Sequence, residues 1–138
     1  MKNVSDIMTR KVYSVDESTS IRDVHQLMNQ QCIQHVIVTG KNQMLTGIIS
    51  DRDVKKYISP FVGSARETTQ DKATLSLKAI SIMAKQVTTI HPEDSLKVCT
   101  ETMLTKNIHA LPVTEKKTDR LLGVVTTTDL LKVFLSML

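Results

Sequence analysis

The chain contains two copies of one sequence unit. Ile7 and Ile82 stand 75 positions apart, and the same offset relates residues of matching character along the whole unit. These pairs include Val12/Val87, Ser20/Ser95, Met28/Met103, Ile33/Ile108 and Val38/Val113. After one extra residue in a loop of the second copy, Gly47 pairs with Gly123 and Asp53 with Asp129. A repeat that spans a full unit with one gap predicts two copies of one small fold.

Each copy predicts the element order β-α-β-β-α. The expected strands are short runs rich in Val and Ile: residues 12–15, 34–38 and 44–49, then 87–90, 109–113 and 120–125. In the first copy Ile21, Val24 and Met28 follow the cap residue Ser20 at helical spacing. In the second copy Asp94 or Ser95 is the expected cap, and Cys99 lies with Leu96 and Met103 on the apolar helix face, where we expect it to be buried. Helices are also expected over 51–58 and 127–138, so the fold class is α/β (α+β).

The duplication divides the chain into repeat 1 (1–58), a linker (59–79) and repeat 2 (80–138). The linker is polar, and from Glu67 onward it could form a helix. A unit of roughly 55 residues buries too little surface to be stable alone. We therefore expect the two repeats to pack sheet to sheet.

One stretch occurs in both copies, as GIISDRD at 47–53 and GVVTTTD at 123–129. It places a hydroxyl and a carboxylate three residues apart where a strand gives way to a helix. One interpretation is structural, with Ser50 and Thr126 as helix N-caps and Asp53 and Asp129 balancing the helix dipole. The other is a binding site, since free N–H groups at a helix start favour a phosphate.

Several function classes are not expected. Aromatic residues are 3% of the chain and its basic residues are scattered, so the net charge of +4 does not indicate nucleic-acid binding. There is no P-loop and no nucleophile motif, so we expect neither catalytic residues nor enzyme activity. The spacing of His and Cys indicates no metal site. No apolar run is long enough to span a membrane, and we see no secretory signal, so a cytoplasmic location is expected.

The ordered set of motifs resembles a cystathionine-β-synthase-type (CBS) domain pair. The resemblance rests on SDIMTRKVYSV and AISIMAKQVTTI at the starts of the two repeats, on HALPV, and on the two G-h-h-[S/T]-x-x-D stretches. It covers essentially the whole chain, with 59–79 between the repeats. The first copy departs from the pattern at Ile37, where HALPV has Pro112.

The resemblance implies a stand-alone, pseudo-two-fold pair of repeats with two clefts between them. Such modules bind adenosyl ligands, namely AMP, ADP, ATP or S-adenosylmethionine, and need no other cofactor. They associate as homodimers and regulate an enzyme or a transporter. The alternative is an interaction or oligomerisation scaffold whose clefts hold nothing, because a fold does not fix its function.

The resemblance also implies roles for particular residues. Asp53 and Asp129 would each hold the two ribose hydroxyls, because charge-assisted hydrogen bonds are the strong ones. Donors for a phosphate would be Ser50 and Arg52 in one site and Thr126 and Thr128 in the other. Residues before the central strand would contact adenine in the opposite repeat's site, which places Ile33 and Gln34 with Asp129, and Ile108 and His109 with Asp53. The Asp53 site is expected to suit a charged ligand better.

Overall fold

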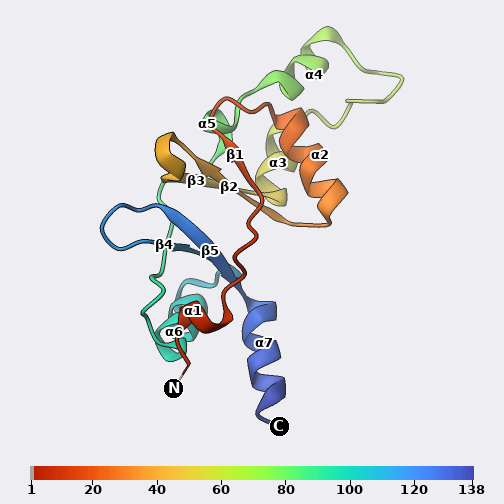
Figure 1. Cartoon of the computed structure of the whole chain (residues 1–138). Helices are drawn as coiled ribbons and strands as arrows, with labels where there is room; N and C mark the ends of the chain where they lie inside the picture. The colour runs from red at the N-terminus through yellow and green to blue at the C-terminus, as the bar shows by residue number, and fades with distance from the viewer. Residues whose placement is uncertain (1) are drawn as a thin grey trace. The chain divides into compact units, whose positions relative to one another are not determined.

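The structure is a computed structural model that describes residues 2–138; residue 1, the first of the predicted repeat 1–58, lies outside them. Figure 1 shows a mixed α+β chain, which confirms the predicted fold class. Its first half contains α1 (Val4–Ile7), β1 (Ser14–Asp16), α2 (Ile21–Gln31), β2 (His35–Thr39), η1 (Lys41–Gln43), β3 (Leu45–Ser50) and α3 (Asp51–Tyr57). Its second half contains α4 (Thr69–Ala73), η2 (Thr74–Ser76), α5 (Ala79–Ile82), α6 (Leu96–Lys106), β4 (Ala110–Thr114), β5 (Leu121–Thr126) and α7 (Thr127–Ser136).

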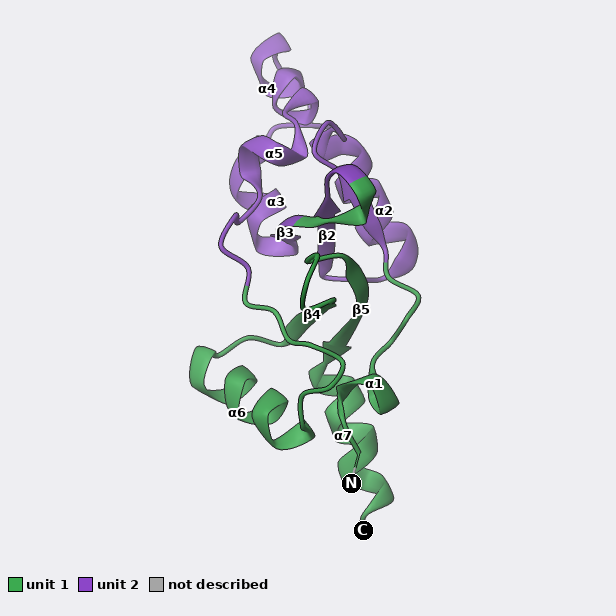
Figure 2. Cartoon of the chain, turned by 60° about the vertical axis from the view of Figure 1, so that its left-hand side comes forward, with its two compact units in different colours: residues 1–12, 42–45, 88–138 green, residues 13–41, 46–87 purple. Residues whose placement is uncertain are grey.

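The chain divides into two compact units (Figure 2). Unit 1 contains the N-terminal segment through Val12, residues 42–45 and residues 88–138. Unit 2 contains residues 13–41 and 46–87. The packing thus divides the chain differently from the sequence repeats, because each unit takes a short segment from the start of the other repeat.

Unit 2 is built on the sheet β1-β2-β3. β1 lies parallel to β2, with Val15 opposite Val38. One face of α2 packs on this sheet through Ile21, Val24 and Met28, all buried, as the helical spacing predicts. The remaining buried members of this core are Val36, Val38, Ile49, Val54, Ala79 and Ile82. Burial of these aliphatic side chains is the main stabilising contribution, since the chain has few aromatic residues.

Unit 1 repeats this plan with a smaller sheet. β4 and β5 are antiparallel, and the strand expected over 87–90 is reduced to a single parallel bridge between Ile90 and Val113. Pro112 explains the loss. At the matching place in unit 2 the Ile37 N–H donates to the Tyr13 carbonyl (3.4 Å), whereas proline has no N–H to donate. The core here contains Val4, Met8, Ile90, Cys99, Met103, Leu111, Val113 and Val125.

Each unit contains an exchanged segment from the start of the other repeat, residues 2–12 in unit 1 and residues 80–87 in unit 2. Backbone hydrogen bonds hold the helix at the start of each segment in place. The Val4 N–H donates to the Asp94 carbonyl (2.9 Å), which holds α1 in unit 1. The Ala79 N–H donates to the Thr19 carbonyl (2.7 Å), which holds α5 in unit 2 at the matching place. Val4 of repeat 1 is buried in the core of unit 1 and Ile82 of repeat 2 in the core of unit 2, so each core is completed by a residue from the other repeat.

Local sequence explains where the two long helices begin and end. Ser20 Oγ accepts from the Asp23 N–H and Ser95 Oγ from the Val98 N–H, so Ser95 and not Asp94 is the second N-cap. Both helices end at a residue in the left-handed region, Cys32 (φ 54°) and Asn107 (φ 52°). The chain can therefore turn sharply into β2 and β4.

The linker is helical over α4 and η2, and its last residue, Ala79, begins α5. Thr68 and Asp71 form a capping box at the start of α4, and Ser59 Oγ donates to Asp71 Oδ1 (2.7 Å). This hydrogen bond from Ser59 is the largest cause that lowers the pKa of the Asp71 carboxyl below its usual value. Across residues 2–138, no helix has the length and apolar character needed to cross a bilayer.

Candidate functional site

The start of α3 in unit 2 holds the first motif carboxylate in a capping box. The Ser50 N–H donates to Asp53 Oδ2 (2.9 Å), and Ser50 Oγ accepts from the Asp53 N–H (3.1 Å). The Asp51 N–H donates to the Gln34 carbonyl (2.8 Å), so the segment before β2 lies beside the helix start. The structural interpretation of Ser50 and Asp53 is therefore correct, and Asp53 Oδ1 takes no part in the capping box.

The start of α7 in unit 1 repeats this arrangement with more donors. The Thr126 N–H donates to Asp129 Oδ2 (2.9 Å), and Thr126 Oγ1 also lies 3.1 Å from Oδ2. The Thr127 N–H donates to the His109 carbonyl (3.0 Å), as Asp51 does to Gln34. A further hydroxyl, Thr9 Oγ1, lies 3.3 Å from Asp129 Oδ1 and 3.4 Å from Oδ2.

The glycine that opens each motif allows a close approach of backbone. In unit 1 a Cβ placed on Gly123 would lie 2.7 Å from the Thr9 carbonyl oxygen. In unit 2 a Cβ on Gly47 would lie 3.0 Å from the Ala84 carbonyl oxygen and would collide with the Met83 side chain. Only glycine therefore admits the exchanged segments against β3 and β5. In unit 1 this approach brings Thr9 to the motif carboxylate.

Some of the residues predicted to contact adenine already form hydrogen bonds and packing contacts within their own units. The N–H groups of Ile33 and Ile108 donate to the carbonyls of Met28 and Met103 (both 3.1 Å). The Ile33 and Ile108 side chains pack against the two cores. Gln34 and His109 are exposed beside the helix start of their own unit. Their predicted pairing with the carboxylate of the opposite repeat stays a prediction.

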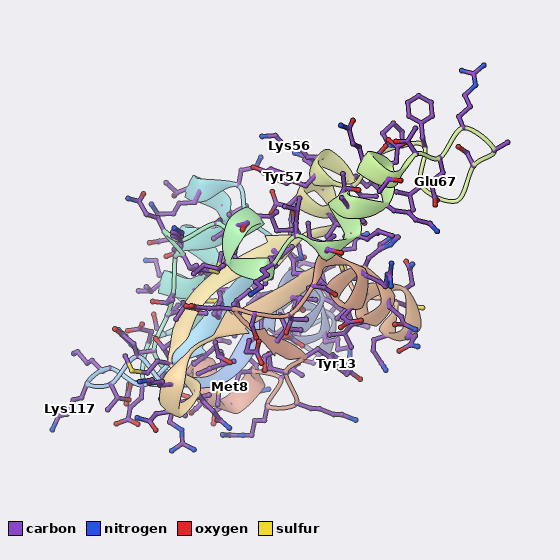
Figure 3. All side chains as sticks on the ribbon, turned by 90° about the horizontal axis from the view of Figure 1, so that it is seen from above. Met8, Tyr13, Lys56, Tyr57, Glu67 and Lys117 are labelled. Carbon is purple, nitrogen blue, oxygen red and sulfur yellow. The ribbon has the colours of Figure 1, made fainter. Side chains whose placement is uncertain are left out.

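The two helix starts differ in charge. Arg52 and Thr128 occupy matching places and both are exposed. Lys55 Nζ lies 3.1 Å from Asp51 Oδ2, so Lys55 forms an ion pair within its own helix. Further along α3, Lys56 Nζ lies 5.7 Å from the centroid of the Tyr57 ring, and both side chains are exposed (Figure 3). The start of α3 thus carries a charge of each sign, on Asp51 and Arg52, where α7 has the neutral Thr127 and Thr128.

Cys99 is a buried titratable group in the core of unit 1. It is fully buried, as expected from its place on the apolar face of α6, whereas Cys32 is exposed. Burial, and next the charges of Asp94 and Asp129, raise the pKa of the Cys99 thiol to about 11. Within residues 2–138, no three His, Cys, Asp or Glu side chains gather as metal ligands would.

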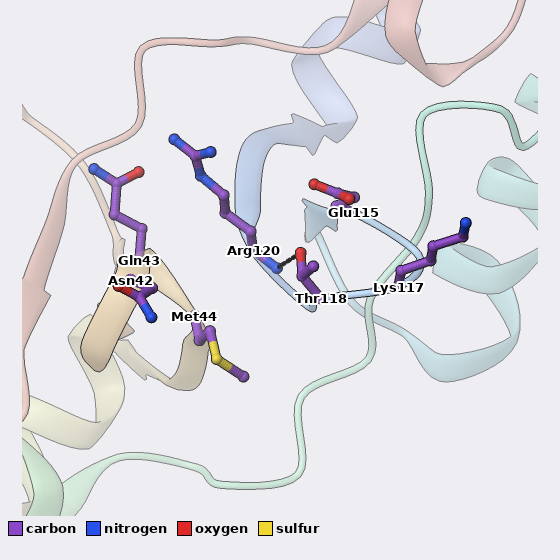
Figure 4. Close-up of a pocket in the computed structure, with 7 residues that line it drawn as sticks. All are labelled: Asn42, Gln43, Met44, Glu115, Lys117, Thr118 and Arg120. Atoms are coloured by element: carbon purple, nitrogen blue, oxygen red, sulfur yellow. Dashed lines mark hydrogen bonds between the residues drawn. The ribbon is translucent and has the colours of Figure 1, made fainter.

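A shallow hollow of about 830 Å³ lies in unit 1 between two loops (Figure 4). Its lining residues are Asn42, Gln43, Met44, Glu115, Lys117, Thr118 and Arg120. All of them are exposed, and Lys117 extends away from its loop (Figure 3). No sequence pattern predicts this hollow, because the single-residue gap between the two copies falls in these loops and makes them the least alike.

The model of the family described as "CBS domain" matches residues 4–60 and 78–136, one match for each repeat. The chain belongs to the CBS domain family. A CBS domain-containing protein of Dictyostelium discoideum is 30% identical over 98% of this chain and 92% of its own length. The homoserine O-acetyltransferase of Methanococcoides burtonii is 28% identical over 93% of this chain, which spans only 23% of that enzyme.

Solved CBS structures share the fold over nearly the whole chain. The AcuB protein of Vibrio cholerae, assigned to acetoin utilization, is 26% identical with a TM-score of 0.83, over 99% of this chain and 93% of its own. CBSX2 of Arabidopsis thaliana, solved in complex with AMP, is 20% identical with a TM-score of 0.83 (99% and 98% covered). The CBS pair of MJ0100, solved with 5′-methylthioadenosine and S-adenosyl-L-methionine, is 22% identical with a TM-score of 0.78 (100% and 99% covered).

Proposed function

We propose that this chain is a regulatory module that binds adenosyl ligands at the two motif carboxylates. The observation that carries the proposal is the pair Asp53 and Asp129, each half-buried, beside an exposed polar residue, and repeated in both CBS domains. No catalytic step is part of the proposal.

The chemistry of the sites supports this ligand class. An ionised carboxylate only accepts hydrogen bonds, and adjacent ribose hydroxyls offer two donors to it. Asp53 Oδ2 takes part in the capping box, so the sugar would bind through Oδ1. A phosphate would lie near Arg52, whose guanidinium can donate two parallel hydrogen bonds. At the other site Thr128 offers only a neutral hydroxyl, which suits a ligand of lower charge.

Proteins of the same fold support the choice of an adenosyl group. CBSX2 has been solved with AMP, and MJ0100 with 5′-methylthioadenosine and S-adenosyl-L-methionine. AMP, ATP and S-adenosylmethionine are therefore the compounds to test first. Sharing of each ligand between the two repeats, with Gln34 serving Asp129 and His109 serving Asp53, stays part of the proposal.

Regulation would follow from a shift in population. A ligand that binds one arrangement of the repeats better than another favours that arrangement, and a partner can respond to it. The acetyltransferase relatives are more than four times as long as the region that this chain matches, so the regulated partner we propose is an enzyme or a transporter. The cytoplasmic location predicted from the sequence would give the module access to nucleotides.

A homodimer is the proposed assembly, and α7 is its proposed contact. Large apolar side chains on and just after this helix are more than half exposed: Leu131, Phe134, Leu135, Met137 and Leu138. Four of these side chains, Leu131, Phe134, Leu135 and Leu138, follow the i, i+3, i+4, i+7 spacing of one helix face, and exposed apolar side chains gathered in this way mark an interaction surface. A second copy presents the same patch and would cover it by two-fold symmetry.

The second candidate is a scaffold that binds no ligand. It is favoured by the capping boxes, because Asp53 and Asp129 already serve their helices without any ligand. The scaffold would use the apolar surface of α7 for assembly and leave the two carboxylates as structural groups.

Titration calorimetry separates the two candidates. AMP, ATP and S-adenosylmethionine are titrated into the wild type and into Asp53→Asn and Asp129→Asn, since asparagine keeps an oxygen for the capping box. Each substitution should weaken binding at its own site by roughly 1.5–3 kcal/mol, the range for hydrogen bonds to charged groups. Asp71→Asn is the matched control, since Asp71 forms a capping box outside the motifs.

Two results would overturn parts of the proposal. Absence of binding by all three compounds to the wild type would leave the scaffold as the function. Wild-type affinity in the double variant Asp53→Asn/Asp129→Asn would show that a ligand binds, but elsewhere.

A further inference from the structure

The two motif carboxylates match in sequence but not in surroundings. Asp129 receives three donors: the Thr126 N–H, the Thr126 hydroxyl and the Thr9 hydroxyl. For Asp53 the structure gives one donor, the Ser50 N–H. A carboxylate has about four lone-pair positions, so Asp129 has much less capacity left for a ligand.

The difference traces to one side chain in each exchanged segment. The N–H and carbonyl of Thr9 pair with Val124 (2.8 and 2.9 Å), five residues before Asp129. Ala84 pairs in the same way with Ile48 (2.9 and 3.1 Å), five residues before Asp53. Thr9 and Ala84 therefore occupy the same place relative to their carboxylates, and only Thr9 has a hydroxyl to donate.

We propose that Thr9 is a positioning residue that holds the Asp129 carboxylate and makes the Asp129 site the weaker one for ribose. The inference rests on the proposed function. A ribose diol arriving at Asp129 must compete with the Thr9 hydroxyl for Oδ1, whereas Ala84, which pairs with Ile48 at the corresponding place in unit 2, has no hydroxyl to compete. Adenosyl ligands therefore fill the Asp53 site first and the Asp129 site only at higher concentration.

The test exchanges the two residues in backgrounds that keep one site each. Asp53→Asn leaves the Asp129 site, where Thr9→Val removes the hydroxyl and preserves the side-chain shape. Asp129→Asn leaves the Asp53 site, where Ala84→Thr adds the hydroxyl. Thr9 and Ala84 are both exposed, so the fold should accept these changes. Thr9→Ser, which keeps the hydroxyl, and Ala84→Val, which adds bulk alone, are the controls.

Adenosine and AMP are the probes, because adenosine reports the sugar without a phosphate. Thr9→Val should tighten adenosine binding to the Asp129 site roughly three- to tenfold, the value of one hydrogen bond, and Ala84→Thr should weaken the Asp53 site by a similar factor. Thr9→Ser and Ala84→Val should behave as their parents. Unchanged or weaker binding by Thr9→Val overturns this inference while the proposed function stands. Absence of binding in the wild type overturns both.

Discussion

At the scale of single residues, the aspartate of each motif supports its helix whether or not a ligand is present. Asp53 and Asp129 accept from the N–H groups of Ser50 and Thr126, groups that would otherwise lack a partner at a helix start. The same geometry orients each carboxylate for a ligand. A functional test must therefore separate lost binding from lost capping, which asparagine does and alanine does not.

The raised pKa of Cys99 predicts a loss of stability in alkaline solution. The thiol has an ordinary pKa of 9.0 and a folded-state pKa of about 11, so the folded chain keeps its proton longer than the unfolded chain. The contribution of the neutral thiol is complete below pH 9.0 and is lost as the pH rises toward about 11. Urea denaturation at two pH values across this window measures it.

Valine stands at the position in repeat 1 that matches Cys99, so Cys99→Val is the natural comparison. The wild type should lose on the order of 1 kcal/mol more unfolding free energy across the window than Cys99→Val. Cys32→Ser, a change at the exposed cysteine, should follow the wild type. Equal losses in wild type and Cys99→Val would contradict the burial of an un-ionised thiol.

Local spacing was sufficient for some residues and not for others. Helical periodicity placed Cys99 in the core, and the cap pattern included Ser95, because both signals act within a few residues. The contact of Thr9 with Asp129 joins residues 120 positions apart, and no local pattern predicts it. The roles of Ser50, Arg52, Thr126 and the other site residues toward a ligand stay predictions.

At the scale of elements, the last helices of the two repeats have diverged on their outer surfaces. α3 has Lys55 where α7 has Leu131, and the residue after α3 that matches Leu135 is Ser59. The positions toward the cores have kept their character, as Val54 and Leu130 show. This divergence at exposed positions supports the homodimer contact that we propose for α7.

The double variant Leu131→Lys/Leu135→Ser gives α7 the residues of repeat 1 and should abolish the proposed homodimer. Removing two apolar contacts on each side of a two-fold interface should shift sedimentation velocity from dimer to monomer at micromolar concentration. Circular dichroism should be unchanged, because both side chains are already exposed. Lys132→Ser, on the same helix, is the control that removes no apolar surface. A variant that sediments as the wild type does would place the interface elsewhere, or show that none exists.

The sequence predicted the long helices and the hairpins, and it did not predict α1 and α5. These two helices have four residues each, too few to display a helical period. The strand expected over 87–90 was wrong for residues 87–89, and only Ile90 pairs with a strand. Pro112 lacks the N–H that forms the corresponding hydrogen bond to β1 in unit 2. The sequences of α1 and α5 were too short to show a helical pattern, and in the strand expected over 87–90 a single residue, Pro112, prevented the pairing.

At the scale of the whole molecule, the compact units are not the sequence repeats. α1 belongs to repeat 1 but packs in unit 1 with α6 and β4, and α5 belongs to repeat 2 but packs in unit 2. The duplication in the sequence could not reveal this exchange, because both arrangements have the same local pattern. Only the long-range pairs, such as Val4 with Asp94, distinguish them.

The exchange predicts that Val4→Ala destabilises the unit formed mainly by repeat 2. Removing two methyl groups from a fully buried site should lower the unfolding free energy by about 2 kcal/mol. Hydrogen exchange should become faster in α6, β4 and β5, with α2 and β2 less affected. Ile82→Ala removes a buried side chain that repeat 2 contributes to unit 2, and it should accelerate exchange in α2 and β2 instead. Faster exchange confined to α2 in Val4→Ala would contradict the observed packing.

Because each half lends the other a missing piece, a cut in the backbone near Gly63 would leave two fragments with incomplete interiors. Neither fragment would hold its shape by itself, yet a mixture of the two could reassemble without the covalent join. The two repeats are therefore not independent folding units, because each core contains side chains from both of them.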